Sequence, residues 1–339
     1  MLRWFVNALC LLSFATAAAQ DAPSYHLPGR LGAGTTQWTQ RPVAGKWHAQ
    51  SVGLVDVQYA STTLLSGAVC VTNRIAGSWT ITDAGLSNLL NKGRGTRRMA
   101  GQGEWTLMAQ FEDSDEAGVL QRTRLTAALA RSVQVSPTWG LRLAFHAGRG
   151  ARRWGMQGIW DSQYVANPVD PGSAASGEAV YAGSRSYFEG GFELGAVAPR
   201  TAIAYRLLHV PANQSLLDGS SDPYTSRHSV LATTRFPVAD GVEATGWAEI
   251  EMQGGARMLT VGAAGVWTFG EDSYFTGARA ATVVSGGLTY RTTGHLSPLL
   301  HVAWKRRWVV WLAPDVPVTA PQSRAAASGL HLGLRAHIG

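Results

Sequence analysis

Charged residues are scarce in this chain. Only 15% of its 339 residues are Asp, Glu, Lys or Arg, while 45% are hydrophobic; ordinary globular chains carry about 25% charged residues. A charge fraction this low is typical of a membrane protein or of a protein with a very large core. Long apolar runs are also missing, because after the N-terminus none reaches the roughly 18 residues of a membrane-spanning helix. With few charges and no membrane-spanning helix, two classes of protein remain: a transmembrane β-barrel and a large soluble β protein.

Cysteine is nearly absent as well. The sequence has only Cys10 and Cys70, and Cys10 lies in the apolar part of an N-terminal segment that has a basic start and ends in three alanines. These features predict a secretory signal peptide, residues 1–19, with cleavage after Ala19. Cys10 lacks the small neighbour of a lipidation site, which argues against a lipoprotein. The mature chain would keep only Cys70 and form no internal disulfide, although its compartment is oxidising.

The mature chain is rich in segments that alternate apolar and polar residues. This period of two is expected of a β-strand with unlike surroundings on its two faces. The clearest segments are 125–129, 141–146, 187–195, 203–207, 259–267, 302–310 and 330–338. Short turns such as Ser136-Pro137-Thr138 join such segments into β-hairpins. The polar positions include Arg and His, which a soluble protein would expose to water and a barrel would place in its lumen.

The amount of strand favours the barrel. Roughly 290 residues, at about 20 per strand with its connection, give about 14 strands. The alternating segment from Leu330 to Ile338 is suited to pair with the first strand, as the closing strand of an outer-membrane barrel does. The 13 tryptophans fit aromatic girdles at the bilayer interfaces, the alternative being core packing in a soluble protein. We therefore predict an all-β fold in which residues 20–339 form one transmembrane antiparallel β-barrel.

Three segments carry local predictions. Leu64 to Thr72 has the pattern of a strand. Glu112 to Glu116 is predicted to be an acidic turn between strands. Asp83 to Arg98 is either a short helix with a basic end or an ordinary loop with solvated charges. The net charge of +7 suits a basic lumen or acidic lipid, whereas export from the cytoplasm argues against a nucleic-acid partner.

Catalytic, cofactor and metal sites are not predicted. Glu178, Glu189 and His209 offer acids and a base, but nothing in their spacing fixes a catalytic geometry. His295 and His301 are six residues apart, so on a strand they share a face at a distance too great for one metal ion. We expect a protein that is not an enzyme and that uses no cofactor.

The most distinctive stretch runs from Trp160 to Ser215. A polar loop punctuated by Pro and Gly separates two segments that alternate like strands, and long ordered loops tend to carry function. We predict that this stretch supplies partner contacts or closes the lumen; the alternative is a structural role in turns and packing. The candidate residues are Trp160, Asp161, Gln163, Tyr164, Asp170, Glu178, Tyr187, His209, Pro211, Asn213 and Gln214.

Five motifs follow one another within this stretch. They are Trp160-Asp161-Ser162-Gln163-Tyr164, Asp170-Pro171, Ser176-Gly177-Glu178, Ser186-Tyr187-Phe188, and Leu208-His209 followed by Pro211 and Asn213-Gln214-Ser215. Their order and spacing resemble the PorP/SprF family, which are outer-membrane proteins of the type IX secretion system of Bacteroidota. The resemblance covers residues 160–237 well and most of the mature chain loosely. It departs at residues 311–315, which replace a Ser-Tyr-Asp segment usual in the family.

The resemblance implies a non-enzymatic outer-membrane component of type IX secretion and gliding. Such a protein supports export or surface attachment of particular cargo, adhesin-like proteins that are recognised through their C-terminal domain. The implied partners are that cargo domain, the periplasmic ring components of the secretion system and outer-membrane lipid. A passive outer-membrane channel for small solutes is the alternative from another class, and conductance separates the two. A third hypothesis, a lipid hydrolase, needs a Ser/His pair facing lipid at the barrel rim.

Overall fold

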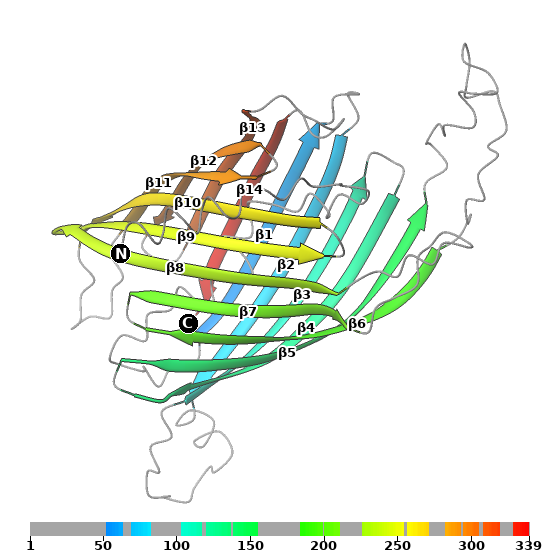
Figure 1. Cartoon of the computed structure of the whole chain (residues 1–339), viewed down its shortest axis with the longest axis horizontal. Coiled ribbons are helices and arrows are strands. Elements are labelled where there is room, and N and C mark those ends of the chain that lie inside the picture. Colours follow the sequence, from blue (N-terminus) through cyan, green and yellow to red (C-terminus); the bar gives the residue numbers. More distant parts are fainter. Residues whose placement is uncertain are drawn as a thin grey trace, which may run out of the picture.

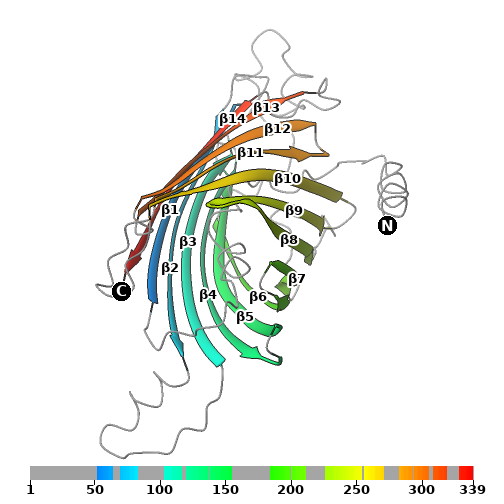
Figure 2. The same cartoon turned by 90° about the vertical axis from the view of Figure 1, so that its left-hand side faces the viewer.

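The computed structural model describes residues 52–63, 69–82, 103–116, 120–136, 138–154, 184–198, 200–210, 226–253, 256–270, 282–292, 294–304, 308–318 and 328–338. Within these ranges the chain forms one closed sheet of 14 antiparallel strands. Figure 1 shows the strands from one side, and Figure 2 shows them wrapping around from β1 to β14. The predicted fold class is confirmed. The predicted signal peptide and the segment 83–98 lie outside the described residues.

Each strand is long enough to cross the hydrocarbon layer of a bilayer. The strands are β1 (Val52–Thr63), β2 (Val69–Thr82), β3 (Gly103–Glu116), β4 (Leu120–Gln134), β5 (Gly140–Trp154), β6 (Ser184–Val197), β7 (Thr201–Val210), β8 (Arg227–Ala239), β9 (Val242–Gln253), β10 (Ala256–Phe269), β11 (Thr282–Arg291), β12 (His295–Trp304), β13 (Trp308–Pro317) and β14 (Ser328–Ile338). About 9–11 tilted residues span the hydrocarbon, and the shortest strands here have 10 residues. No helix among the described residues is long and apolar enough to cross a membrane.

The topology is an up-and-down meander that closes on itself. Every strand pairs with its neighbours in sequence, and β1 pairs with β14 from Gly53↔Ile338 to Thr63↔Ser328. The pairing leaves no open sheet edge, which a bilayer requires because lipid cannot satisfy backbone N–H and C=O groups. Closure also defines two rims. The rim at which β5, β7 and β13 finish is called the loop end. The opposite rim is called the terminal end.

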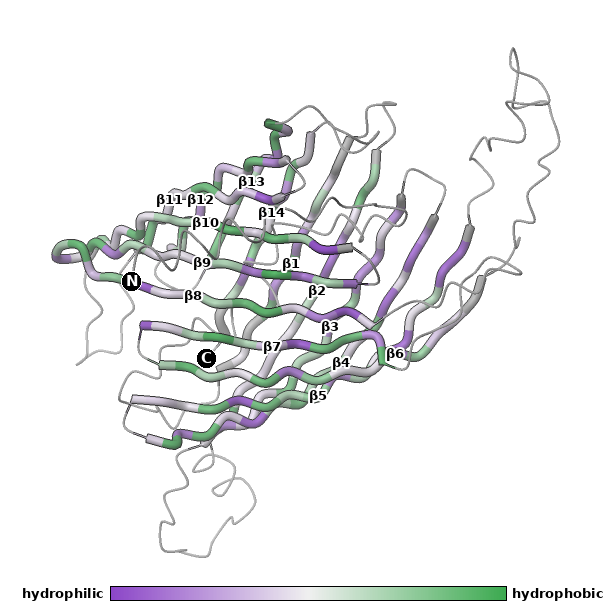
Figure 3. The backbone as a smooth tube through the Cα atoms, in the orientation of Figure 1, coloured by the Kyte–Doolittle hydropathy of each residue, from purple (hydrophilic) through white to green (hydrophobic). Residues whose placement is uncertain are grey.

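The two faces of the wall have opposite chemistry. On β5, Leu141, Leu143 and Phe145 are 43%, 41% and 61% exposed on the outside, whereas Arg142 and Ala144 are buried on the inside. The same alternation repeats along the other strands, as the hydropathy colouring of Figure 3 shows. Exposed apolar side chains on nearly every strand form a belt that would be costly in water and is favourable in lipid. The fold and this belt together define an outer-membrane β-barrel.

The tryptophans divide between the two faces. Trp79, Trp304 and Trp308 are 49%, 56% and 42% exposed on the outside, as expected of girdle residues. Trp247 and Trp311 are buried on the inner face, so for these two the prediction of a girdle is wrong. The reason lies in the neighbouring strand: each indole ring occupies the space that a glycine leaves open. A Cβ on Gly262 would lie 2.2 Å from Trp247, and one on Gly333 would lie 2.0 Å from Trp311.

Two local predictions are corrected. The segment from Glu112 to Glu116 is strand, not turn, because β3 pairs with β4 as far as Glu116↔Leu120 and places alternate acids on opposite faces. The strand predicted from Leu64 begins only at Val69. Thr63 pairs with Val69 across the β1–β2 hairpin, and residues 64–68 lie outside the described residues.

Candidate functional site in the barrel lumen

Two of the candidate residues lie within the described chain, Tyr187 on β6 and His209 on β7. Both side chains are on the inner face near the loop end. The Tyr187 ring packs against Arg152, whose Cζ atom lies 5.2 Å from the ring centroid. Gly150 on β5 leaves room for that ring, since a Cβ there would lie 2.2 Å from it. The other candidates lie outside the described residues: Trp160, Asp161, Gln163, Tyr164, Asp170, Glu178, Pro211, Asn213 and Gln214.

His209 occupies a β-bulge. The register of β6 with β7 shifts between Gly190 and Gly191, which leaves His209 as the extra residue of β7. Its φ of 60° is in the left-handed region, where a residue with a side chain costs about 1–2 kcal/mol. The bulge turns the imidazole to the inside, where it is 1% exposed. There Nδ1 of His209 lies 2.7 Å from Oε2 of Glu189, and this buried hydrogen bond offsets the backbone strain.

Glu189 connects His209 to a chain of charges across the inner wall. Arg124 Nη1 lies 3.5 Å from Glu189 Oε1, and Arg124 Nη2 donates to Glu112 Oε2 at 3.1 Å. Thr126 Oγ1 donates to Glu189 Oε1 at 3.4 Å. Glu112 in turn lies 3.7 Å from Arg74 Nε. The network therefore runs from β2 through β3, β4 and β6 to β7.

A glycine on β5 allows this network to cross a strand. Gly148 stands between Thr126 on β4 and Glu189 on β6 in the paired register. A Cβ at Gly148 would lie 2.8 Å from a backbone oxygen of Leu125 and 3.3 Å from the Glu189 side chain. Because both distances are shorter than ordinary contacts, any larger residue would push the two polar side chains apart. The site is thus assembled from five strands and depends on one position without a side chain.

Further ion pairs line the inner face of the described strands. Glu193 Oε2 accepts hydrogen bonds from Arg206 Nε at 3.1 Å and from Nη2 at 3.0 Å. Other pairs are Arg227–Glu251, Arg291–Asp315 and Arg335–Asp56. Breaking one partner of such a buried pair leaves an uncompensated charge, which costs about 3–5 kcal/mol. The lumen wall is therefore polar and held in a defined arrangement, as expected of an outer-membrane barrel interior.

The described residues also bring a Ser/His pair to the outer face near the loop end. Ser226 Oγ lies 3.2 Å from His228 Nε2, and Tyr205 Oη lies 2.8 Å from His228 Nδ1. A hydrolase triad needs a third group that stabilises the imidazolium and backbone donors for an oxyanion. Tyr205 offers a phenol and not a carboxylate, and β8 is paired on both sides at His228, with Leu207 and with Met252. Within the described part of the chain, the trio thus lacks the groups that would complete an acyl-transfer site.

No metal centre is formed by the described residues, in which no three His, Cys, Asp or Glu side chains are placed to hold an ion. His295 and His301 share the inner face of β12, as their spacing predicts. His295 is 5% exposed, and His301 Nδ1 lies 3.1 Å from Ser285 Oγ. These histidines are parts of the polar inner wall.

Comparison with known proteins supports the fold. No family model and no curated protein matches the sequence. Among solved structures, the chain is similar to the Ralstonia pickettii toluene transporter TbuX, with a TM-score of 0.52 and 10% identity over 86% of this chain and 90% of that one. It is also similar to the CymD monoaromatic hydrocarbon channel, with a TM-score of 0.52 and 11% identity over 86% and 88%. Identities this low show a shared outer-membrane barrel fold and nothing finer.

Proposed function

We propose that this chain is a non-enzymatic outer-membrane component of the type IX secretion and gliding machinery. It supports export or surface attachment of particular cargo proteins through their C-terminal sorting domain, and it contacts the periplasmic ring of that machinery. The support is the resemblance of residues 160–237 to the PorP/SprF family, on a chain with an outer-membrane barrel fold. The precursor loses residues 1–19 by cleavage after Ala19 and reaches the outer membrane.

The observation that carries this proposal is the buried bond between His209 and Glu189. His209 is the last but one residue of β7, which ends at the connection 211–226, and Glu189 lies on β6, which follows residues 155–183. One strained, buried link therefore joins the roots of both connections that hold the remaining motif residues. Strain of this kind is retained where the surrounding structure has to hold one arrangement, and partner-binding loops need such a rigid base.

The test is simultaneous replacement of Trp160, Tyr164 and Glu178 by Ala, followed by quantitative comparison of secreted and surface proteins. Large aromatics with polar neighbours are typical anchors of a protein interface. We expect one specific cargo protein to be lost from the surface while other type IX cargo is exported. Barrel assembly should be intact. Gel migration measures this, because a closed barrel resists detergent and migrates faster before boiling than after it.

A matched control uses the connection between β10 and β11 at the terminal end. Replacing Glu271, Tyr274 and Phe275 by Ala removes the same kinds of side chain, and this variant should export all cargo at the normal level. Normal export by the first variant would show that residues 155–183 have a structural role. Loss of the same cargo in the control would show that the effect is not specific to the motif.

A passive channel for small solutes is the second candidate, and two observations favour it. The inner face carries paired charges such as Glu193–Arg206, and a polar lumen is characteristic of water-filled barrels. The two solved structures with the same fold are described as a toluene transporter and a monoaromatic hydrocarbon channel. Purified protein in planar bilayers distinguishes the candidates: steady single-channel conductance supports a channel, whereas a closed barrel fits the export function.

A further inference from the structure

The apolar belt ends sharply on the outer face of β3 and β4. Phe111 on β3 and Leu125 on β4 are 46% and 59% exposed and belong to the belt. The next outward positions toward the loop end are Asp113 and Thr123, which pair with each other in the register. Two residues of strand advance about 6.8 Å, and the headgroup layer on each side of the hydrocarbon is about 5–8 Å thick. These polar side chains therefore lie at the depth of lipid headgroups.

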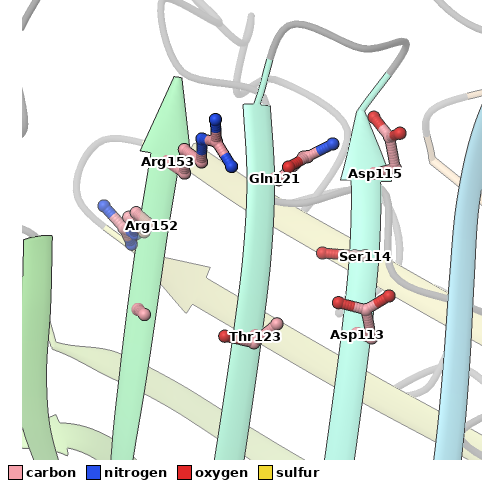
Figure 4. Close-up of a pocket in the computed structure, with 8 residues that line it drawn as sticks. Asp113, Ser114, Asp115, Gln121, Thr123, Arg152 and Arg153 are labelled. Atoms are coloured by element: carbon pink, nitrogen blue, oxygen red, sulfur yellow. The ribbon is translucent and has the colours of Figure 1, made fainter. Parts of the chain in front are cut away.

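A cavity of about 310 Å³ opens at this level and spans three strands. Asp113 and Asp115 line it from β3, Gln121 and Thr123 from β4, and Arg153 from β5. Figure 4 shows these side chains side by side across the three strands. The cavity thus places two carboxylates and a guanidinium on the membrane side of the wall.

The opposite charges do not neutralise each other directly. Asp115 pairs with Gln121, which pairs with Arg153, so the acid and the base share one register position with a strand between them. Adjacent strands are about 4.8 Å apart, which separates the two backbones by about 10 Å. Neither Asp113 nor Arg153 forms an ion pair or hydrogen bond within the described part of the chain. Nearby, Arg149 Nη2 donates to Ser186 Oγ at 3.3 Å.

We infer that this cavity binds the phosphoethanolamine group of a membrane lipid. The phosphate is bound by Arg153, whose planar guanidinium suits a tetrahedral anion, and the ammonium group by Asp113, with Asp115 two residues further along the same face of β3. The acyl chains then lie along the apolar belt at Phe111 and Leu125. A headgroup with one negative and one positive group separated by a short linker matches a cavity with the reverse arrangement of charges. This inference needs the barrel to span a bilayer and is independent of the export function.

Two kinds of lipid can supply the phosphoethanolamine group: a phospholipid, and a glycolipid that carries phosphoethanolamine as a substituent. The test is native mass spectrometry of the detergent-purified barrel with added lipid, which counts proteins that retain one lipid molecule. Phosphatidylethanolamine is compared with phosphatidylglycerol, which keeps the phosphate and lacks the amine. Lipid A with and without phosphoethanolamine forms the second pair. In at least one pair, the lipid with the amine should be retained about tenfold better, since a charge-assisted hydrogen bond contributes about 1.5–3 kcal/mol.

Three variants sharpen the test. Arg153→Ala should weaken retention of both members of the pair about tenfold, because both carry the phosphate. Asp113→Asn with Asp115→Asn should remove only the preference for the amine. The matched control is Arg257→Ala, which removes an exposed arginine from the loop end of β10 and should change nothing.

The pattern of retention decides the outcome. Preference within the phospholipid pair identifies a phospholipid, and preference within the glycolipid pair identifies a glycolipid of the outer leaflet; both support the inference. Equal retention of the lipids with and without the amine in both pairs overturns it. An equal effect of Arg257→Ala and Arg153→Ala overturns it as well, because retention would then reflect general surface charge.

Discussion

Glu189 and His209 are twenty residues apart in the chain and share a buried hydrogen bond of 2.7 Å across a β-bulge. The bond forms only because His209 adopts a φ of 60°, a conformation that ordinary side chains avoid and glycine adopts freely. Two substitutions separate the contributions of the side chain and of the backbone. Both remove the imidazole, and they differ only in the cost of the backbone conformation.

We expect His209→Gly to be more stable than His209→Ala by about 1 kcal/mol, because Ala keeps the strain and Gly relieves it. Both variants should be less stable than the native protein, since Glu189 loses a buried partner. Reversible unfolding in urea with the barrel refolded into lipid vesicles measures the difference. Equal stability of the two variants, or a more stable Ala variant, would mean that the bulge is lost once the imidazole is removed.

Adjacent alanines on β10 test which side of the wall faces lipid. Ala263 points outward in the middle of the belt, opposite Leu288, and Ala264 points inward, opposite Gly287. Arg at position 263 should destabilise the barrel by about 2–4 kcal/mol, the cost of a guanidinium near the bilayer midplane. Arg at position 264 should cost much less, because its side chain would extend into the polar lumen and not into lipid. Comparable losses in vesicle unfolding would contradict the assignment of faces.

Gly333 and Trp311 test the packing of the inner wall. A Cβ at Gly333 would lie 2.0 Å from the indole Nε1, so Gly333→Ala should cost about 1–3 kcal/mol through overpacking. Gly286→Ala is the control on the outer face of β11, where the nearest atom would be 3.9 Å away. That variant should be as stable as the native chain or up to about 1 kcal/mol more stable. If Gly333→Ala were as stable as the native protein, the Trp311 ring would be able to turn away at little cost in free energy.

Cys70 reports the orientation of the barrel. It lies near the loop-end start of β2, where it is half-buried and is the one cysteine in the described chain. Outer-membrane barrels place their longer loops outside the cell, and the longest connection, residues 155–183, is at the loop end. We therefore expect a maleimide too large for porins to label Cys70 in intact cells.

The control for that experiment moves the thiol to the other rim. Asp240→Cys in a Cys70→Ser background places it in the exposed β8–β9 turn at the terminal end. It should react only after the outer membrane is permeabilised. Labelling of both proteins in detergent establishes that each thiol is accessible. If intact cells showed labelling at position 240 and none at Cys70, the barrel would have the opposite orientation.

The facing of the strands is predictable from the sequence because lipid and lumen impose a strict period of two. Leu143 and Phe145 on β5 are recognisable for that reason. The positions of Trp247 and Trp311 are not predictable in this way, since they depend on Gly262 and Gly333 in neighbouring strands and therefore on the register. Single-strand alternation contains no information about which residue lies opposite.

The candidate site is predictable only in part. Tyr187 and His209 are found from the motif, but the bulge that turns His209 inward leaves no usable compositional signal, because even histidine adopts a left-handed backbone at only a small fraction of its positions. Arg124 and Glu112, which sequence reasoning missed, carry a usable signal. They face each other in the register of the β3–β4 hairpin, and opposite charges at paired positions of a hairpin predict a contact.

The pairing of β1 with β14 has a consequence for biogenesis. In the described sheet it is the one pairing between strands that are not neighbours in sequence, and Arg335 Nε donates to Asp56 Oδ2 across it at 2.9 Å. All other pairings join strands that are neighbours in sequence and can form locally as the chain folds. Until β14 arrives, Asp56 is without its cation, and two sheet edges would meet hydrocarbon if the chain were inserted. A factor that delivers this protein to its membrane therefore has to shield β1 until β14 pairs with it, and truncation before Ser328 should yield a protein that is held in transit and degraded.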